Sequence, residues 1–206
     1  MNKEEMIEEI KPHTVMNAIG AESIIPPIPG VDKAFVKDSH DVLDGKAEAT
    51  GNVVVIGGGM VGMETAEYLA EKGAKVSVLE MLPDICSDMG TTRKICMGEE
   101  IQKSGIIPVT SIKVTEIGDN VVIGEKDGEK VEFPCDTAVL AIGAKKRDGS
   151  ALAETCYKNG IGYFEIGDAA MARRAINATR EAMDAALTFD REDVHRDVSK
   201  PKKLVF

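Results

Sequence analysis

The sequence contains no tryptophan, few other aromatic residues and only four cysteines. The cysteines include no C-x-x-C pair, and the three histidines lie far from them and from one another. Zinc and iron-sulfur sites need clustered ligands, and redox-active disulfides need paired thiols. The spacing therefore predicts no metal site, no disulfide chemistry and reduced thiols.

Long apolar runs and basic stripes are also absent. The longest apolar run, Val53 to Met63, is interrupted by four glycines, whereas a membrane helix needs roughly 20 apolar residues. The net charge is −10, with scattered acidic residues, so neither a membrane nor a nucleic acid is expected as a partner. The acidic start MNKEEMIEEIK resembles neither a secretory signal nor a transit peptide. These features predict a cytoplasmic protein.

The apolar periodicity predicts an α/β fold. A run of β-branched residues at 53–56 predicts a strand buried on both faces of a parallel sheet, and the helical spacing over 60–72 predicts a helix. Further strands are expected at 75–79, 106–109 and 136–142, within 161–170 and soon after residue 13. Further helices are expected at 3–11, 92–103 and 174–189. The alternating segment 111–134 predicts an antiparallel meander of about three strands.

The glycines after the first buried strand carry the clearest chemical signal. Gly57, Gly59 and Gly62 form G-x-G-x-x-G, which allows a tight turn, close approach to a pyrophosphate, and close packing of helix on strand. Glu80 ends the next strand about 20 residues further on, where an acid accepts hydrogen bonds from an adenosine ribose. The alternative is that the glycines serve only a tight turn.

Two other strands end in nearly the same motif, VMNAIGAES and CDTAVLAIGAKK. Ordinary core packing would explain either one alone. Together they suggest two related dinucleotide-binding sheets, of which only one has its glycine fingerprint in this chain. Proline and glycine at 26–30 are typical of a connector, so a domain crossing is expected within residues 25–50.

The segments AIGAESIIPPIPG, VVVIGGGMVGMETAEYLAEKG, DTAVLAIGAKK and YFEIGDAA occur in an order that resembles a known family. It is the pyridine nucleotide-disulfide oxidoreductase superfamily, flavoproteins with two dinucleotide-binding domains. The chain most resembles the C-terminal part of the 2,4-dienoyl-CoA reductase and NADH:flavin oxidoreductase (Old Yellow Enzyme-like) group. The resemblance extends from about residue 7 to residue 190.

The resemblance implies a Rossmann-like NAD(H)-binding domain with a parallel sheet and a meander crossover, inserted into a split FAD domain. The expected domains are 1–45, the end of the first FAD half with a linker; 46–150, the NAD(H) domain; and 151–206, the second FAD half and tail. The residues expected at NAD are Gly57, Gly58, Gly59, Met60, Val61, Gly62, Glu80, Ala141, Ile142 and Gly143. Those expected at FAD are Ala18, Gly20, Gly167, Asp168, Ala175 and Ile176. Glu64 is expected near the nicotinamide; the alternative is a solvated helix glutamate.

The expected function is the NADH-binding module of an FAD-dependent oxidoreductase, which delivers hydride to flavin. The chain looks like a fragment that lacks the N-terminal flavin-binding region, so we expect it to bind nucleotide and turn over little alone. Alternatives are a non-enzymatic NAD(H) sensor and a small NAD-dependent dehydrogenase. NADH is expected over NADPH, because no basic residue follows Glu80 before Arg93. The risk is that Lys145, Lys146 or Arg147 folds toward a 2′-phosphate.

Overall fold

The computed structural model describes residues 3–87 and 89–189; of residues 3, 4 and 91–96 it describes the backbone alone. The chain divides into two compact units. We call Ser23–Gly143 the inserted unit, and Met1–Glu22 with Ala144–Phe206 the split unit. The first boundary lies earlier than the expected 45/46, because residues 36–38 pair with a strand of the inserted unit. The second lies at 143/144, where 150/151 was expected.

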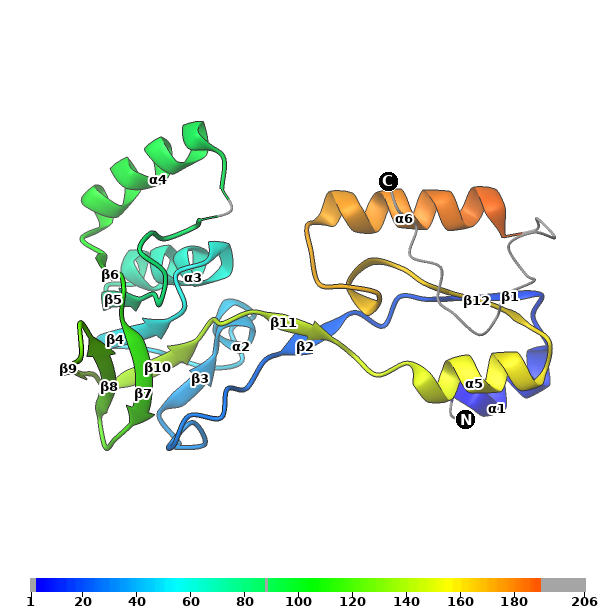
Figure 1. Ribbon diagram of the computed structural model, residues 1–206, viewed down its shortest axis with the longest axis horizontal. Helices are drawn as coiled ribbons and strands as arrows, with labels where there is room; N and C mark the ends of the chain where they lie inside the picture. The colour runs from blue at the N-terminus through cyan, green and yellow to red at the C-terminus, as the bar shows by residue number, and fades with distance from the viewer. Residues whose placement is uncertain (1–2, 88, 190–206) are drawn as a thin grey trace. The chain divides into compact units, whose positions relative to one another are not determined.

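The inserted unit is built on a five-stranded parallel sheet in the order β3-β10-β4-β5-β6 (Figure 1). Its strands are β3 Val36–Asp38, β4 Asn52–Ile56, β5 Lys75–Leu79, β6 Ile107–Val109 and β10 Thr137–Leu140. The chain moves outward from β4 to β5 and β6, and then returns to β10 on the other side of β4. This reversal makes β4 and β10 the switch point, the usual ligand position in open α/β sheets.

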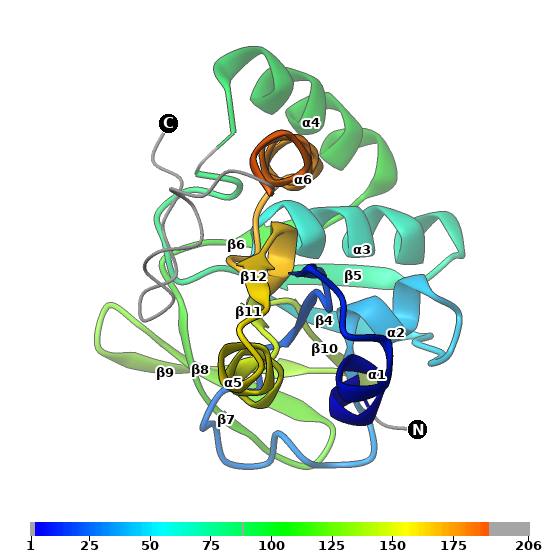
Figure 2. The ribbon, with the colours of Figure 1, turned by 90° about the vertical axis from the view of Figure 1, so that its right-hand side faces the viewer.

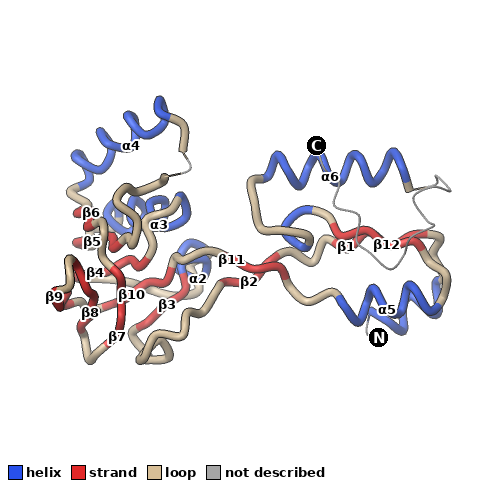
Figure 3. The backbone as a smooth tube through the Cα atoms, in the orientation of Figure 1, coloured by secondary structure: helices blue, strands red, loops and turns tan. Residues whose placement is uncertain are grey.

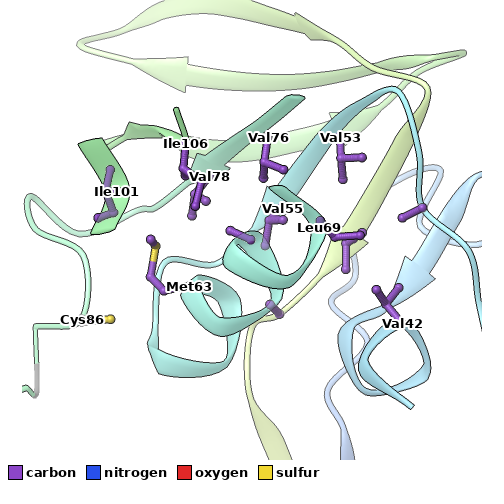
Figure 4. Close-up of a cluster of buried hydrophobic side chains, with 14 of the residues drawn as sticks. Val42, Val53, Val55, Met63, Leu69, Val76, Val78, Cys86, Ile101 and Ile106 are labelled. Atoms are coloured by element: carbon purple, nitrogen blue, oxygen red, sulfur yellow. The ribbon is translucent and has the colours of Figure 1, made fainter. Parts of the chain in front are cut away.

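Helices cover one face of this sheet and an antiparallel meander covers the other. The helices are α2 Ser39–Leu43, α3 Met60–Glu71 and α4 Thr91–Ser104; the meander is β7 Lys113–Ile117, β8 Val121–Lys126 and β9 Glu129–Pro134. Val53 and Val55 pack with the helices, while Val54 and Ile56 pack with the meander. In Figure 4, Met63 and Leu69 of α3 lie against the valines of β4 and β5. The run of β-branched residues is therefore buried on both faces, as predicted.

The split unit centres on two parallel strands, β1 Thr14–Asn17 and β12 Gly162–Glu165. Helices α1 Lys3–Ile10 and α5 Ser150–Lys158 lie on one side of the pair, and α6 Ala175–Thr188 lies on the other (Figures 1 and 2). A short 3-10 turn, η1 Gly167–Ala169, follows β12. Ile7, Leu152, Cys156 and Ile161 form a small core between the helices α1 and α5 and the strands.

The chain passes between the units twice, through β2 Ala21–Ser23 and β11 Ala144–Lys146, which pair with each other (Figure 3). The expected fold class is confirmed: a Rossmann-like α/β arrangement with a parallel sheet and an antiparallel meander. The sequence did not predict α2, α5, η1, β2, β3 or β11, none of which has more than nine residues. None of the described helices is long and apolar enough to span a bilayer, and the described part of the chain gathers no metal-ligand cluster.

The thiol of Cys135 should make stability depend on pH. Burial, and then the charge of Asp136, raise the pKa of this thiol from 9.0 to about 11. Between these values the unfolded thiol ionises while the folded thiol stays protonated, so the stabilisation present below pH 9 is lost as pH rises toward 11. We expect a loss of about 2 kcal/mol near pH 10.5.

Urea unfolding at pH 8 and at pH 10.5, monitored by a signal that reports on the inserted unit, measures this loss of stability. Cys135→Val, which is similar in size, should show a smaller loss between the two pH values. The comparison is needed because the pKa values of Cys156, Tyr157 and Tyr163, all in the split unit, are raised as well. Equal losses in wild type and variant would contradict the role of Cys135.

Candidate functional site

The candidate site of the inserted unit lies at the carboxyl edge of its sheet. Strand register places Ile56 opposite both Leu79 and Leu140, and Leu140 opposite Asp38. The strands therefore end level, and the residues that follow them meet at one edge. This edge gathers all the residues expected at NAD, from the three segments 57–62, 80 and 141–143.

The glycine-rich loop joins β4 to α3 with almost no free space. Gly57 has φ +111°, a left-handed conformation that disfavours side chains, and a Cβ there would lie 2.5 Å from the carbonyl oxygen of Ala141. A Cβ on Gly62 would collide with the carbonyl oxygen of Gly57. Because both positions are glycine, the first turn of α3 packs directly against the ends of β4 and β10.

Gly59 differs from its two neighbours in the fingerprint. It is exposed, caps α3 in an extended conformation, and would place a Cβ in open space with no atom within 4 Å. The first N–H groups of an α-helix have no partner within the helix, and its N-terminus carries partial positive charge. The turn from Gly59 through Met60 and Val61 to Gly62 therefore fits a pyrophosphate, which needs backbone approach and N–H donors.

Glu80 connects the glycine loop to the segment after β5. Its Oε2 accepts a hydrogen bond from the N–H of Gly58 at 2.6 Å, and its Oε1 accepts one from the N–H of Leu82 at 2.8 Å. The N–H of Cys86 donates to the carbonyl oxygen of Gly58 at 2.8 Å, a second connection between the glycine loop and the segment after β5. Each carboxylate oxygen still has a lone pair for a ligand hydroxyl. Nothing in the sequence indicated that Glu80 also holds the loop in place.

The third segment follows β10. Ala141 is buried and donates its N–H to the carbonyl oxygen of Ile56 at 2.8 Å, while the Ile142 side chain packs into the core below the meander. Gly143 is exposed, has φ +107°, and accepts a hydrogen bond from the N–H of Ile24 at 3.0 Å. The small residues leave the backbone open at this end of the edge. Glu64 lies exposed on α3, which leaves both of its interpretations open.

The residues expected at FAD gather in the split unit. Asn17 pairs with Glu165, so β1 and β12 also end level, and Ala18, Gly20, Gly167 and Asp168 follow these ends. The N–H of Gly167 donates to Oε2 of Glu181 on α6 at 2.8 Å. Oδ1 of Asp168 accepts from the N–H of Arg173 at 3.1 Å. Ala175 and Ile176, both exposed, begin α6.

A buried polar network that the sequence did not predict lies beside these residues. Asn17, only 2% exposed, donates from Nδ2 to the hydroxyl of Tyr163 at 2.8 Å. That hydroxyl lies 3.3 Å from Oε1 of Glu165, whose Oε2 binds Lys146 at 2.9 Å. Burial is the main cause of the raised pKa of Tyr163. A Cβ on Gly149 would lie within 3.0 Å of polar atoms of all three residues Asn17, Tyr163 and Glu165. The signal in the sequence was Asn17 itself, a polar residue at the end of an apolar strand.

The three basic residues that could have met a 2′-phosphate have other partners, all in the split unit. Lys145 pairs with Glu22 at 3.2 Å and Lys146 with Glu165 at 2.9 Å. The guanidinium of Arg147 donates from Nε to the carbonyl oxygen of Ala21 at 2.9 Å. The side chain of Arg93 lies outside the described residues.

Comparison with known proteins gives one family. The pyridine nucleotide-disulphide oxidoreductase family matches residues 2–182. A bilirubin reductase of Mediterraneibacter gnavus is 44% identical over 141 residues, 68% of this chain and 22% of that protein. An NADH oxidase of Thermoanaerobacter brockii is 40% identical over 187 residues, 88% of this chain and 29% of that protein. The structure of a 2-naphthoyl-CoA reductase with 2-naphthoyl-CoA matches with a TM-score of 0.84 and 28% identity, over 91% of this chain and 28% of that one. The chain thus spans less than a third of these relatives.

Because Gly62 lies so close to Gly57, adding one methyl group at position 62 should destabilise the inserted unit strongly. Gly62→Ala should lower the free energy of unfolding of the inserted unit by about 2 kcal/mol or more, because a backbone carbonyl must move. Gly98→Ala is the control: it lies within α4, with no atom within 4 Å of the new Cβ, and should gain about 0.5 to 1 kcal/mol. Chemical denaturation measures both, and a neutral Gly62→Ala would refute the packing argument.

Proposed function

The chain belongs to the pyridine nucleotide-disulphide oxidoreductase family, and we propose that its inserted unit binds NADH and delivers hydride to a flavin in the parent enzyme. The observation that carries this proposal is the carboxyl edge of the sheet. There the open N-terminus of α3 at Gly59 and the carboxylate of Glu80 lie on adjacent strand ends, joined by the bond from Gly58 to Glu80. An anion site beside a ribose acceptor suits a dinucleotide.

Each segment of the edge has a separate task in this proposal. The backbone from Gly57 to Gly62 holds the pyrophosphate, and Glu80 accepts from the adenosine ribose. Ala141, Ile142 and Gly143 give the nicotinamide half an open surface. Hydride transfer itself is chemistry that the bound nicotinamide and flavin supply; the protein orients the cofactor and excludes water. Glu64 is proposed to lie near the nicotinamide.

The split unit is proposed to supply part of the flavin site through Ala18, Gly20, Gly167, Asp168, Ala175 and Ile176. The sequence holds a single G-x-G-x-x-G, so the loop for the flavin pyrophosphate would come from an N-terminal flavin-binding region of the parent protein. The surface of α6 supports such a partner: Ile176, Met183 and Leu187, which share one face, are 56%, 65% and 62% exposed, while its buried residue is the small Ala185.

The acceptor of the electrons is proposed to lie outside this chain. The relatives include reductases named for bilirubin and for 2-naphthoyl-CoA, two chemically different compounds. A shared NADH module that feeds different acceptor sites would explain why the matched part is similar among them. On this proposal the isolated chain binds nucleotide and turns over little, which a steady-state assay with NADH and added FAD measures.

The Glu80 carboxylate predicts a preference for NADH over NADPH. A 2′-phosphate about 4 Å from this carboxylate would be repelled by roughly 1 to 4 kcal/mol, and the ribose hydroxyl bond would be lost. The affinity for NADH should exceed that for NADPH by about ten- to a thousandfold. Calorimetric titration of the chain with both cofactors measures the ratio. Equal affinities, or tighter binding of NADPH, would refute the assignment of Glu80.

Variants of Glu80 separate its two tasks. Glu80→Ala removes both the ribose acceptor and the acceptor for the N–H of Gly58. It should therefore lower both the affinity for NADH and the free energy of unfolding. Glu80→Gln keeps one acceptor oxygen and should lose less stability. Both variants should narrow the gap between NADH and NADPH. Urea denaturation of the apo variants, run beside the titrations, shows how much of the effect on binding comes from the loop.

Gly59→Ala tests the pyrophosphate site with little disturbance of the fold. The backbone there suits alanine and the new methyl meets no atom within 4 Å, so stability should fall by at most about 1 kcal/mol, the loss of a good helix cap. The methyl would occupy the space that the pyrophosphate needs, and NADH affinity should fall by about tenfold or more. Unchanged NADH affinity in a folded variant would contradict the site.

A further inference from the structure

The carboxyl edge of the sheet continues beyond β10 to a fourth strand end that the fingerprint does not include. Asp38, the last residue of β3, lies opposite Leu140 of β10. Helix α2 begins at Ser39, and its Val42 packs into the same core as Leu69 of α3 (Figure 4). The segment 38–40 therefore lies one strand beyond the 141–143 segment, about 5 Å further along the edge.

A polar cluster occupies this end of the edge. Nδ1 of His40 lies 3.1 Å from the hydroxyl oxygen of Ser23 and 3.4 Å from Oδ1 of Asp38. Ser23 precedes Ile24, whose N–H donates to the carbonyl oxygen of Gly143 at 3.0 Å. The cluster is thus anchored beside the exposed Gly143, where the edge is open.

The surroundings of His40 leave one ring nitrogen available to a ligand. The Asp38 carboxylate beside Nδ1 favours a proton on that nitrogen, so in the neutral ring Nε2 carries the lone pair and accepts a hydrogen bond. Within the described part of the chain Nε2 makes no hydrogen bond, and the side chain is 53% exposed. A ligand at this end would therefore present a hydrogen-bond donor.

We propose that His40, held by Ser23 and Asp38, binds the nicotinamide nucleotide half of the cofactor by accepting a hydrogen bond at Nε2. This inference rests on the proposed function. With the adenosine at β5 and the pyrophosphate at β4, the second nucleotide extends away from Glu80, across β10 toward β3. The donors that this half offers are its ribose hydroxyls and its carboxamide NH2.

Calorimetric titrations of the full chain with NADH and with ADP test the assignment, because ADP has the adenosine and the two phosphates but no nicotinamide nucleotide. His40→Ala should lower the affinity for NADH by about three- to tenfold, the effect of one hydrogen bond. The affinity for ADP should stay within about twofold of the wild-type value. His40→Gln, whose side-chain oxygen can still accept, should retain part of the affinity. Ser23→Ala, which removes a support of the ring, should give a smaller loss for NADH alone.

Lys46→Ala is the matched control, since Lys46 follows α2 and its exposed side chain pairs only with Asp44 among the described residues. It should leave both affinities unchanged. Nicotinic acid adenine dinucleotide, with a carboxylate in place of the carboxamide, distinguishes the donor. If His40→Ala lowers the affinity for this analogue as well as that for NAD+, the ribose is the donor. If the variant lowers the affinity for NAD+ alone, the carboxamide is the donor. Either result supports the site.

Two outcomes would overturn the inference: unchanged NADH affinity in His40→Ala, or equal weakening of NADH and ADP, which would show a structural effect on the whole edge. Failure of the proposed function looks different. In that case the wild-type chain binds neither NADH nor ADP, whatever residue stands at position 40.

Discussion

The contact of Gly62 with the carbonyl oxygen of Gly57 is the constraint on which the candidate site depends. A side chain at Gly62 would collide with that oxygen, and one at Gly57 would meet the carbonyl of Ala141. Only without these side chains can α3 begin directly at the ends of β4 and β10. Its N-terminus, where the first N–H groups have no partner within the helix, then lies at the switch point of the sheet, the usual ligand position in open α/β sheets.

Glu80 shows how the same edge is stabilised without a ligand. The carboxylate accepts hydrogen bonds from the N–H groups of Gly58 and Leu82, so the protein itself holds the loops on both sides of it in place. A preorganised loop loses less conformational entropy on binding. The same bonds mean that substitutions of Glu80 act on the fold as well as on the ligand, and a loss of affinity alone does not identify a ribose contact.

The sequence predicted the fold class, the family and the elements around the fingerprint, because their signals are local. The run of β-branched residues from Val53 to Ile56 predicted a strand buried on both faces, and all four residues are buried. The glycines after this strand have the spacing of a known strand-to-helix turn. The position of β3 could not be predicted in this way. It has three residues, and its place beside β10 depends on a pairing between residues about a hundred positions apart, Asp38 and Leu140. For the same reason the proximity of Ser23, His40 and Gly143 became visible only in the structure.

The two units differ in how their sites depend on folding. All the residues proposed for NADH lie in one continuous segment, Ser23–Gly143, so their edge forms when that unit folds. The residues proposed for flavin come from both ends of the chain and meet only when Thr14 pairs with Gly162. Closing so long a loop is entropically costly. A folded inserted unit already holds its own two ends together, because the N–H of Ile24 donates to the carbonyl oxygen of Gly143 at 3.0 Å. Assembly of the split unit should therefore follow that of the inserted unit, and damage to the glycine contact should weaken both.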